Sequence, residues 1–310
     1  MSVGEVSRAD FLKAMEKTLD DVFTAGYNLR GDQYSKVFDV RDSRKRQEEV
    51  LEYVGPSEIT KSNEGGMYQR VLIESGRSRN FLHITYKAEI KVTQEMVEDV
   101  MYDRIIQASK MLGIAAKRTV EKKCAEFFWN SITGSEKTPD NVAVASTVHP
   151  VLYPEGTNPT TWSNLITDSF SSNAVKKMRS LMRKTRDERG DISPHFMNQL
   201  IVTPDLEWVA QELLNSKLLY DTAENATNTV GKGLELVVLD HLADAPTPYD
   251  EDMFVGRDKE MAMNIFYWRV RPTSGFINEE ASGDPVWRAR MRFSLGCASP
   301  RGIAFSTGQS

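Results

Sequence analysis

The chain has 310 residues, a formal net charge of -5 and only two cysteines, and 40% of its residues are hydrophobic against 27% charged. These proportions exclude an intrinsically disordered or collagen-like chain. No run of about 18 apolar residues is present, and the first residues lack the pattern of a secretory signal, so the sequence predicts a cytosolic protein without membrane contact. We expect Cys124 and Cys297 to be buried free thiols, because two cysteines cannot form a disulfide framework or a four-cysteine zinc site.

Residues 1–65 are predicted to form an N-terminal arm, since most of this region is too polar for a core of its own. Apolar residues with helical spacing predict one helix at 9–25: Phe11, Leu12, Met15, Leu19, Val22 and Phe23. The segment 41–49, RDSRKRQEE, is interpreted as a solvated strip, with a specific contact site as the alternative.

A long hairpin is predicted after Gly65 and Gly66. Apolar and polar residues alternate from 82 to 92, which indicates a strand, and residues 67–74 form a second β-prone run. The intervening residues 75–78, Ser-Gly-Arg-Ser, suit a turn. A lone ribbon about 35 Å long is marginally stable in water, so the hairpin needs another surface to lie on.

From residue 93 the apolar period changes to 3.6 and predicts one helix about 55 Å long over 93–130, with Thr93 as its N-cap. Gly113 inside it should cost about 1 kcal/mol relative to alanine and permits a bend. The remaining predicted elements are a helix at 174–188, a helix from Pro204 and strands at 199–203, 234–239, 254–255, 262–270 and 287–295. Helices and strands mix without a βαβ rhythm, which favours an α+β fold.

The helix at 174–188 is strongly basic. Up to residue 190 it carries only Asp187 and Glu188 against seven cations: Lys176, Lys177, Arg179, Arg183, Lys184, Arg186 and Arg189. No aromatic residue interleaves them, so a solvated or subunit-facing surface is favoured over a nucleic-acid site.

No pattern in the sequence predicts a catalytic, cofactor or metal site. Phosphate-binding glycine loops are absent, and the four histidines, His83, His149, His195 and His241, stand in four different predicted elements. Ser146 and His149 are neighbours in one loop and suggest an oligomeric hydrolase as an alternative function, although triad members are normally distant in sequence. We therefore expect a chain that binds other chains rather than an enzyme.

Taken in order, these elements resemble the major capsid protein family of tailed bacteriophages, whose fold is shared with encapsulins. The segments that carry the resemblance are EFFWNSITG, DNVAVASTVHP, NQLIVTPDLEWVAQELLNS, GLELVVLDHL and WRARMRFSLGCASPRGIAF. The resemblance implies five parts: the arm at 1–65, an extended E-loop hairpin at 66–92, a peripheral domain with the spine helix at 93–198, an axial domain at 199–285 and a C-terminal return at 286–310.

The same resemblance implies hexamers and pentamers of an icosahedral head that encloses double-stranded DNA, located in the virion and assembled in the host cytoplasm. A separate scaffolding protein, a portal and a decoration protein are the further partners that it suggests. Charged residues of the hairpin become candidates for contacts between subunits: Arg70, Glu74, Arg77, Arg79, Lys87 and Glu89. The expected hairpin tip at 73–81 contains no lysine, so a covalent cross-link through a tip lysine is not expected. An encapsulin-like shell is the alternative within this fold.

Overall fold

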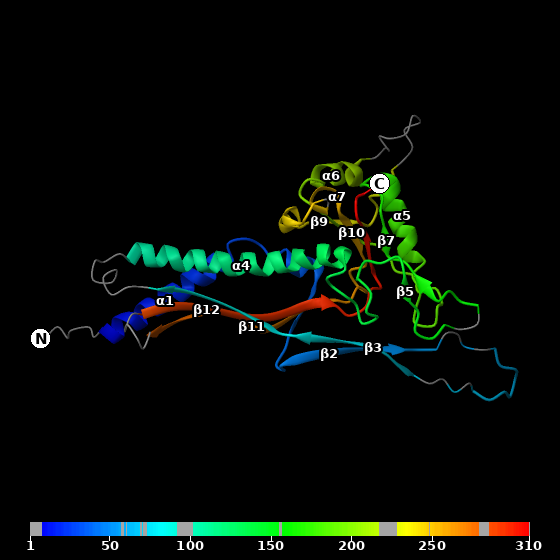
Figure 1. The fold of residues 1–310 in the computed structure, drawn as a ribbon, viewed down its shortest axis with the longest axis horizontal. Coiled ribbons are helices and arrows are strands. Elements are labelled where there is room, and N and C mark those ends of the chain that lie inside the picture. Colours follow the sequence, from blue (N-terminus) through cyan, green and yellow to red (C-terminus); the bar gives the residue numbers. More distant parts are fainter. Residues whose placement is uncertain are drawn as a thin grey trace, which may run out of the picture.

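The computed structural model describes residues 8–56, 59, 61–68, 70, 73–91, 102–154, 157–216, 228–247, 249–278 and 285–309. The molecule is elongated, with helix α4 (Tyr102–Thr133) lying along the long strands β11 (Asn264–Asn278) and β12 (Pro285–Cys297) (Figure 1). A second group of strands and helices stands at one end of this layer and carries the C-terminus. The α+β fold class is confirmed. Within the described residues, each helix is too short or too polar to span a lipid bilayer.

The predicted N-terminal helix is confirmed as α1 (Arg8–Tyr27), which crosses α4 at very short distance. A Cβ atom added to Gly113 of α4 would lie 2.2 Å from the carbonyl oxygen of Phe23 in α1, and one added to Gly26 would lie 2.4 Å from that of Lys110. Gly113 therefore allows the two helices to touch, a role that helix propensity alone does not reveal. The predicted start of the spine helix at Thr93 lies outside the described residues.

A four-stranded sheet lies beneath α4 in the order β1-β11-β12-β4. Strand β1 (Asp39–Asp42) runs parallel to β11, and β4 (Ile84–Lys91) runs antiparallel to β12. The face toward α4 is rich in aromatic rings, and Phe266 stacks on Phe293 with 5.0 Å between ring centroids. This sheet and α4 form the main hydrophobic core.

The predicted hairpin between residues 67–74 and 82–92 is wrong. Strand β3 (Glu74–Leu82) pairs with β2 (Gln47–Val54), from Gln47 opposite Leu82 to Val54 opposite Glu74. The predicted turn at 75–78 lies inside β3, and β4 pairs with β12 instead. Alternation identifies a strand and its buried face but not its partner, and here the partner comes from the charged segment before the hairpin.

The chain passes from β3 to β4 at His83, which is buried, and its pairing partner changes there from β2 to β12. One ring nitrogen of His83 lies 2.9 Å from the Ser294 hydroxyl and the other lies 2.9 Å from the Ser43 hydroxyl. Ser43 follows β1 and Ser294 belongs to β12, so His83 ties the start of the β2–β3 ribbon to the four-stranded sheet. Figure 1 shows this ribbon extending away from the sheet.

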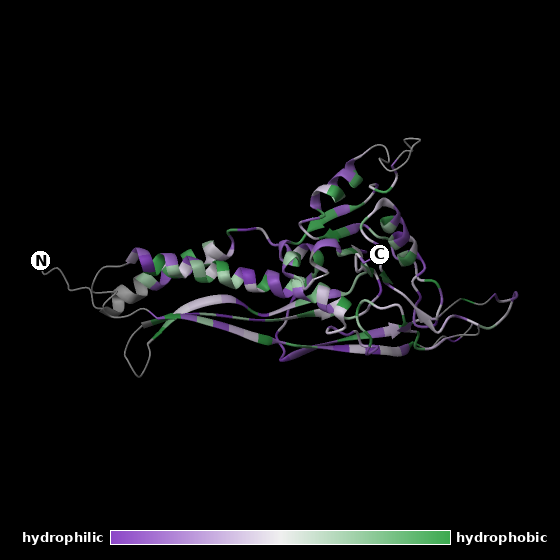
Figure 2. Cartoon of the chain, turned by 45° about the horizontal axis from the view of Figure 1, so that its top comes forward, coloured by the Kyte–Doolittle hydropathy of each residue, from purple (hydrophilic) through white to green (hydrophobic). Residues whose placement is uncertain are grey.

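The end domain is built on a five-stranded sheet in the order β7-β13-β10-β8-β9. Its strands are β7 (Leu165–Ile166), β13 (Ile303–Ser306), β10 (Phe254–Arg257), β8 (Gln199–Val202) and β9 (Glu235–Val238). The predicted strands at 199–203, 234–239 and 254–255 are thereby confirmed. Figure 2 shows hydrophobic strands inside this domain and mostly polar or pale colouring along the β2–β3 ribbon.

Helices cover both faces of this sheet. Helices α5 (Ser172–Arg183) and α6 (Glu207–Asn215), which confirm two predicted helices, pack with Leu200 and Val202 on one face. The 3-10 helix η1 (Asp240–Asp244), the short helix α7 (Tyr249–Asp252) and the end of α4 pack on the other. Strand β11, within the region predicted as axial domain, belongs to the long sheet, whereas β13 and α5, predicted as peripheral, belong to this one.

The smallest elements are α2 (Tyr34–Val37) and the two-residue strands β5 (His149–Pro150) and β6 (Thr161–Trp162), which pair with each other. They lie around the junction of the two sheets. Tyr34 and Val37 of α2 belong to the main core, so the region predicted as a polar arm contributes to the body of the subunit.

Candidate assembly surfaces

The far end of the β2–β3 ribbon presents apolar side chains to solvent. Ile59 and Met67 are each 90% exposed, Tyr68 is 100% exposed and Ile73 is 74% exposed. Large apolar side chains that are almost fully exposed on a folded protein can mark a contact site. A two-stranded ribbon is also marginal without support, so this end is the first candidate for contact with another chain.

The base of the same ribbon is held by buried ion pairs. Nη1 of Arg301 donates to Glu52 of β2 and to Glu188, with both nitrogen–oxygen distances at 2.8 Å. Arg77 of β3 lies 3.4 Å from the second oxygen of Glu188. Two arginines and two carboxylates therefore join both ribbon strands to the end domain.

The two carboxyl groups of this cluster titrate differently. Burial raises the pKa of Glu52 to about 7, and the neighbouring Glu188 adds to that rise. Burial also acts to raise the pKa of Glu188, but hydrogen bonds from Arg301 and Glu52 outweigh it and leave that pKa below its usual value. The pair therefore holds one proton, on Glu52, until the pH rises through about 7.

A second set of contacts, made by Arg189, lies beside these ion pairs. Arg189 donates through Nε to the carbonyl oxygen of Gly55 at 2.8 Å, and its Nη2 lies 3.3 Å from the Glu74 carboxylate. Both contacts hold the point where the ribbon strands give way to the connecting segment. The paired strands are thus anchored to the end domain, whereas the described residues of the segment that connects them, 59, 61–68, 70 and 73, are exposed.

Most of the predicted interface residues form contacts inside their own subunit. Glu74 and Arg77 bind the residues described above, Arg79 pairs with Glu136, and Glu89 lies 3.0 Å from Arg288. Arg70 and Lys87 have no ion pair among the described residues. The structure thus gives four of these six residues an internal partner, and contacts with a second subunit remain a prediction for all six.

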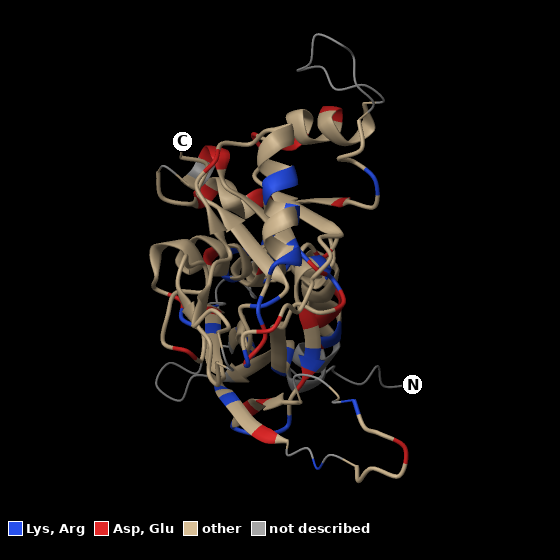
Figure 3. Ribbon diagram, turned by 90° about the vertical axis from the view of Figure 1, so that its right-hand side faces the viewer, with Lys and Arg blue, Asp and Glu red and all other residues tan. Residues whose placement is uncertain are grey.

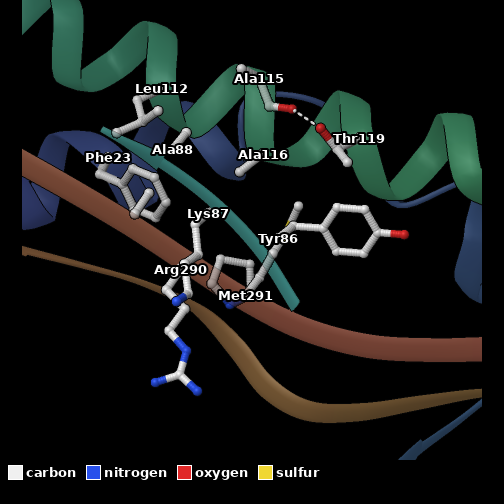
Figure 4. Close-up of a pocket in the computed structure, with 12 residues that line it drawn as sticks. Phe23, Tyr86, Lys87, Ala88, Leu112, Ala115, Ala116, Thr119, Arg290 and Met291 are labelled. Carbon is white, nitrogen blue, oxygen red and sulfur yellow. Dashed lines mark hydrogen bonds between the residues drawn. The ribbon is translucent and has the colours of Figure 1, made fainter. Parts of the chain in front are cut away.

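A cavity of about 160 Å³ separates α4 from the sheet (Figure 4). It is lined mainly by apolar groups, among them Phe23 of α1, Leu112 and Ala116 of α4, and Met291 of β12. In Figure 4 the Arg290 guanidinium extends away from α4. The lining contains no carboxylate, histidine or cysteine, and the polar side chains among the lining residues are those of Tyr86, Lys87, Thr119 and Arg290.

The Ser146 and His149 pair, the basis of the hydrolase alternative, does not form a nucleophile and base. His149 is fully buried, and its ring nitrogens lie 2.8 Å from Asp140 and 3.2 Å from the side-chain oxygen of Asn164. The Ser146 hydroxyl instead accepts a hydrogen bond from the Val148 amide. His149 also stacks on Trp162 at 4.8 Å, and the network fixes the β5–β6 loop.

Cys124 and Cys297 are buried free thiols, as predicted. Burial raises the pKa of both, that of Cys297 to about 12, so neither is a thiolate at neutral pH. Among the described residues, no three or more histidine, cysteine, aspartate or glutamate side chains gather as metal ligands do.

No local pattern predicted the residues that anchor the ribbon. Glu52 lies in the predicted arm, Glu188 at the end of the predicted basic helix and Arg301 in the predicted C-terminal return. They are separated by more than a hundred residues, and no local spacing relates them. Only the fold brings them together.

Comparison with known proteins identifies the family. Residues 83–305 match the family model described as "Phage capsid protein". No curated protein matches the chain by sequence. Among solved structures, the virus-like particle of Pyrococcus furiosus has 13% identity and a TM-score of 0.54, with 94% of this chain and 98% of that chain covered.

Two phage capsids share the fold at similar distance. The capsid of the cyanophage P-SCSP1u has 13% identity and a TM-score of 0.56, covering 89% of this chain and 88% of that one. The mature capsid of bacteriophage PhiM1 has 10% identity and a TM-score of 0.54, covering 89% and 87%. At 10–13% identity, the similarity to these solved structures shows only a shared fold. The family model matches well over half of the chain and therefore shows which family the chain belongs to. The chain belongs to the phage capsid protein family.

Proposed function

We propose that this chain is the major capsid protein of a tailed-phage head, in which copies form hexamers and pentamers of a closed icosahedral shell around double-stranded DNA. The family membership supports a structural role in the virion, with assembly in the host cytoplasm. A scaffolding protein, a portal and a decoration protein are the further partners that we propose.

The parts of this subunit follow the two sheets. The β2–β3 ribbon, residues 47–82, acts as the E-loop, and the long sheet with α1 and α4 acts as the peripheral domain. The five-stranded sheet with α5, α6, η1 and α7 acts as the axial domain. This division replaces the hairpin at 66–92 and moves β11 and β13 between the domains.

One observation carries the proposal: the ribbon has a tightly held base and an exposed apolar end. A subunit that functions alone gains nothing from four apolar side chains at the end of a two-stranded projection. A subunit in a shell buries them against its neighbour, and specific interfaces of that kind typically bury about 1,200–2,000 Å². Identical chains joined through different surfaces form rings that close.

The test is to express the protein and image it for closed particles by electron microscopy. Replacing Met67 and Tyr68 by serine should leave the subunit folded and reduce the yield of particles, because both side chains are exposed in the single subunit. Met111→Ser on α4, where the side chain is 59% exposed, is the matched control and should assemble normally. Absence of particles from the unaltered protein, with and without a scaffolding partner, would contradict the proposal.

An encapsulin-like compartment is the second candidate. The similarity to the Pyrococcus furiosus virus-like particle, which extends over 94% of this chain, favours keeping it. The nucleic-acid content of particles from phage-producing cells separates the two functions, since a phage head contains double-stranded DNA. Particles from such cells that enclose protein and no DNA would support the compartment.

A further inference from the structure

The axial domain carries opposite charge on two short segments. Residues 174–186 contain six basic side chains and no acidic one: Lys176, Lys177, Arg179, Arg183, Lys184 and Arg186. Residues 240–252 contain five acidic side chains and no lysine or arginine: Asp240, Asp244, Asp250, Glu251 and Asp252. The first segment includes most of α5, and the second runs from η1 through α7.

The five-stranded sheet separates these two segments. Met178 of α5 packs with Leu200 of β8, whereas Leu242 of η1 packs in the cluster that contains Ile201, the next residue of β8. Successive side chains of a strand point to opposite faces, so α5 lies on one face and η1 with α7 on the other. In Figure 3, α5 faces the viewer with its blue lysine and arginine positions, and Figure 1 shows α5 and α7 on opposite sides of the domain.

Most cations of α5 have no carboxylate partner among the residues that the structure describes. Lys177 lies 2.6 Å from Asp168, but Lys176, Arg183 and Lys184 are exposed and form no ion pair among the described residues. Burial lowers the pKa of Arg179, and the nearby charge of Arg183 lowers it further; Arg179 forms no ion pair among the described residues.

A groove of about 530 Å³ opens beside these cations. Arg179, Arg183 and Lys232 line it, and the Arg183 guanidinium lies 5.2 Å above the ring of Phe196, which is 57% exposed. An open groove with three cations and an exposed ring is a surface suited to an anionic partner that also has apolar groups.

The acidic segment has the complementary property. Asp240 and Glu251 are exposed and form no ion pair among the residues that the structure describes. Asp244 is shared between Lys122 at 3.6 Å and His241 at 3.3 Å. Tyr249, between these acids, is half-buried and supplies an aromatic group next to them.

We infer that the basic face of α5 in one copy binds the acidic η1–α7 face of the next copy, which makes a head-to-tail contact between axial domains. This inference rests on the proposed function, because it requires copies that form rings. A heterologous contact joins two different faces of the same protein, and here the faces are opposite in position and in charge. Such charges set the register of the ring and speed its assembly.

Packaged DNA is the other partner that a basic strip could take. DNA would satisfy α5 and the exposed Phe196 but would leave the acidic face on the opposite side without a role. A second copy satisfies both faces with one contact. The observations therefore favour the neighbouring subunit.

Charge reversal with rescue tests this contact. The basic variant combines Lys176→Glu, Arg183→Glu and Lys184→Glu, and the acidic variant combines Asp240→Lys and Glu251→Lys. The matched control, Lys176→Arg with Arg183→Lys and Lys184→Arg, keeps the sign of every charge. Native mass spectrometry measures the oligomers, electron microscopy counts closed particles, and thermal unfolding checks that each subunit is folded.

Each reversal alone should lower the assembled fraction at least about tenfold, since several pairs change from attraction to repulsion. Mixing the two variants should restore contacts between unlike copies, and the control should behave as the unaltered protein. Unchanged assembly of either reversed variant, or no recovery on mixing folded variants, would overturn the inference. Intact particles of the basic variant that have lost their DNA would assign α5 to nucleic acid instead.

Two further outcomes separate this inference from the proposed function. Oligomers that are lost on charge reversal and recovered on mixing, but that never close into shells, would support the contact between axial domains and contradict the proposed shell function. If a reversed subunit fails to fold, the salt dependence of the unaltered protein decides, because at about 1 M salt charges are screened within about 3 Å. Assembly that is as fast at about 1 M salt as at about 0.05 M would overturn the inference.

Discussion

The crossing of α1 and α4 at Gly113 gives the sharpest prediction about stability. Helix propensity alone predicts that Gly113→Ala stabilises the protein by about 1 kcal/mol. The structure predicts the opposite sign, because the new Cβ atom would lie 2.2 Å from the Phe23 carbonyl oxygen and 2.9 Å from the Tyr27 amide nitrogen. Backbone atoms cannot rotate out of the way, so α1 must move by about 1 Å to reach an ordinary contact distance.

The cost of that movement follows from what α1 buries. Leu19 and Phe23 are 0% and 2% exposed in the cluster with Ile105 and Leu112, and overpacking of such a site costs about 1–3 kcal/mol. After subtracting the gain in helix propensity, we expect the free energy of unfolding to fall by up to about 2 kcal/mol. Denaturant unfolding of the purified subunit measures this change, provided that the dependence of the unfolding free energy on denaturant concentration is the same in both variants.

Met111→Ala is the control, because Met111 lies on the same helix, is 59% exposed and does not face α1 at this crossing. We expect its free energy of unfolding to change by less than about 0.5 kcal/mol. An increase in stability for Gly113→Ala would refute the reasoning, since it would mean that α1 does not lie against α4 at the distance described. Faster hydrogen exchange of α1 in the alanine variant would support the stated cause.

Three other predictions concern titratable groups. Because the pKa of Glu52 in the folded protein is raised to about 7, the stability that this group contributes is fully present below the ordinary glutamate pKa and is lost as the pH rises through about 7. Glu52→Gln should remove this pH dependence. Hydrogen exchange of β2, compared between about pH 6 and about pH 8, measures it. Burial acts to raise the pKa of Asp140, but hydrogen bonds from His149, Thr138 and the Val142 amide outweigh it and lower that pKa. The stability that this group contributes is therefore present above the ordinary aspartate pKa and is lost in acid. Asp140→Asn should therefore destabilise the subunit by about 3 kcal/mol in chemical unfolding at neutral pH, and a change below about 1 kcal/mol would count against the network. Cys124 and Cys297 should react with a thiol reagent only on unfolding, and rapid labelling of the native protein would contradict their burial.

Local patterns in the sequence predicted most elements of the fold, because periodicity reports a helix or strand directly. The spine helix is the clearest case, since its apolar period continues to Phe128 without a proline. The strand before it was also predicted, and β4 occupies residues 84–91 of the expected 82–92. What failed was the choice of partner for that strand, because register and pairing depend on residues far away in the chain.

The charged segment at 41–49 shows why pairing was hidden. Its composition is typical of a solvated strip, yet Asp39–Asp42 forms β1 beside β11 and Gln47–Val54 forms β2. Strands at the edge of a sheet or in a ribbon keep most side chains in water, so composition cannot distinguish them from loops. An aromatic residue beside the basic helix was hidden for a related reason: Phe196 comes from a separate segment, so the local pattern of the helix does not contain it.

The corrected ribbon leads to a last prediction about the difference between a free and an assembled subunit. Strand β12 has paired strands on both sides and a helix above it, whereas β2 and β3 pair only with each other among the described residues. Segments with little buried surface open with free energies near zero, while central strands open only with global unfolding. In the free subunit we therefore expect the exposed segment that connects β2 to β3, at Met67 and Tyr68, to exchange its amide hydrogens at least about a hundredfold faster than β12.

Assembly should remove most of that difference, because a neighbouring subunit would cover this connecting segment and slow its exchange. Hydrogen exchange measured by mass spectrometry on subunits and on particles at the same pH makes the comparison. The first residues of β2, near Gln47 and close to the buried His83, serve as an internal control and should be protected in both states. If the connecting segment is already as protected in the free subunit as in the particle, then its exposed apolar side chains must be explained without a neighbour.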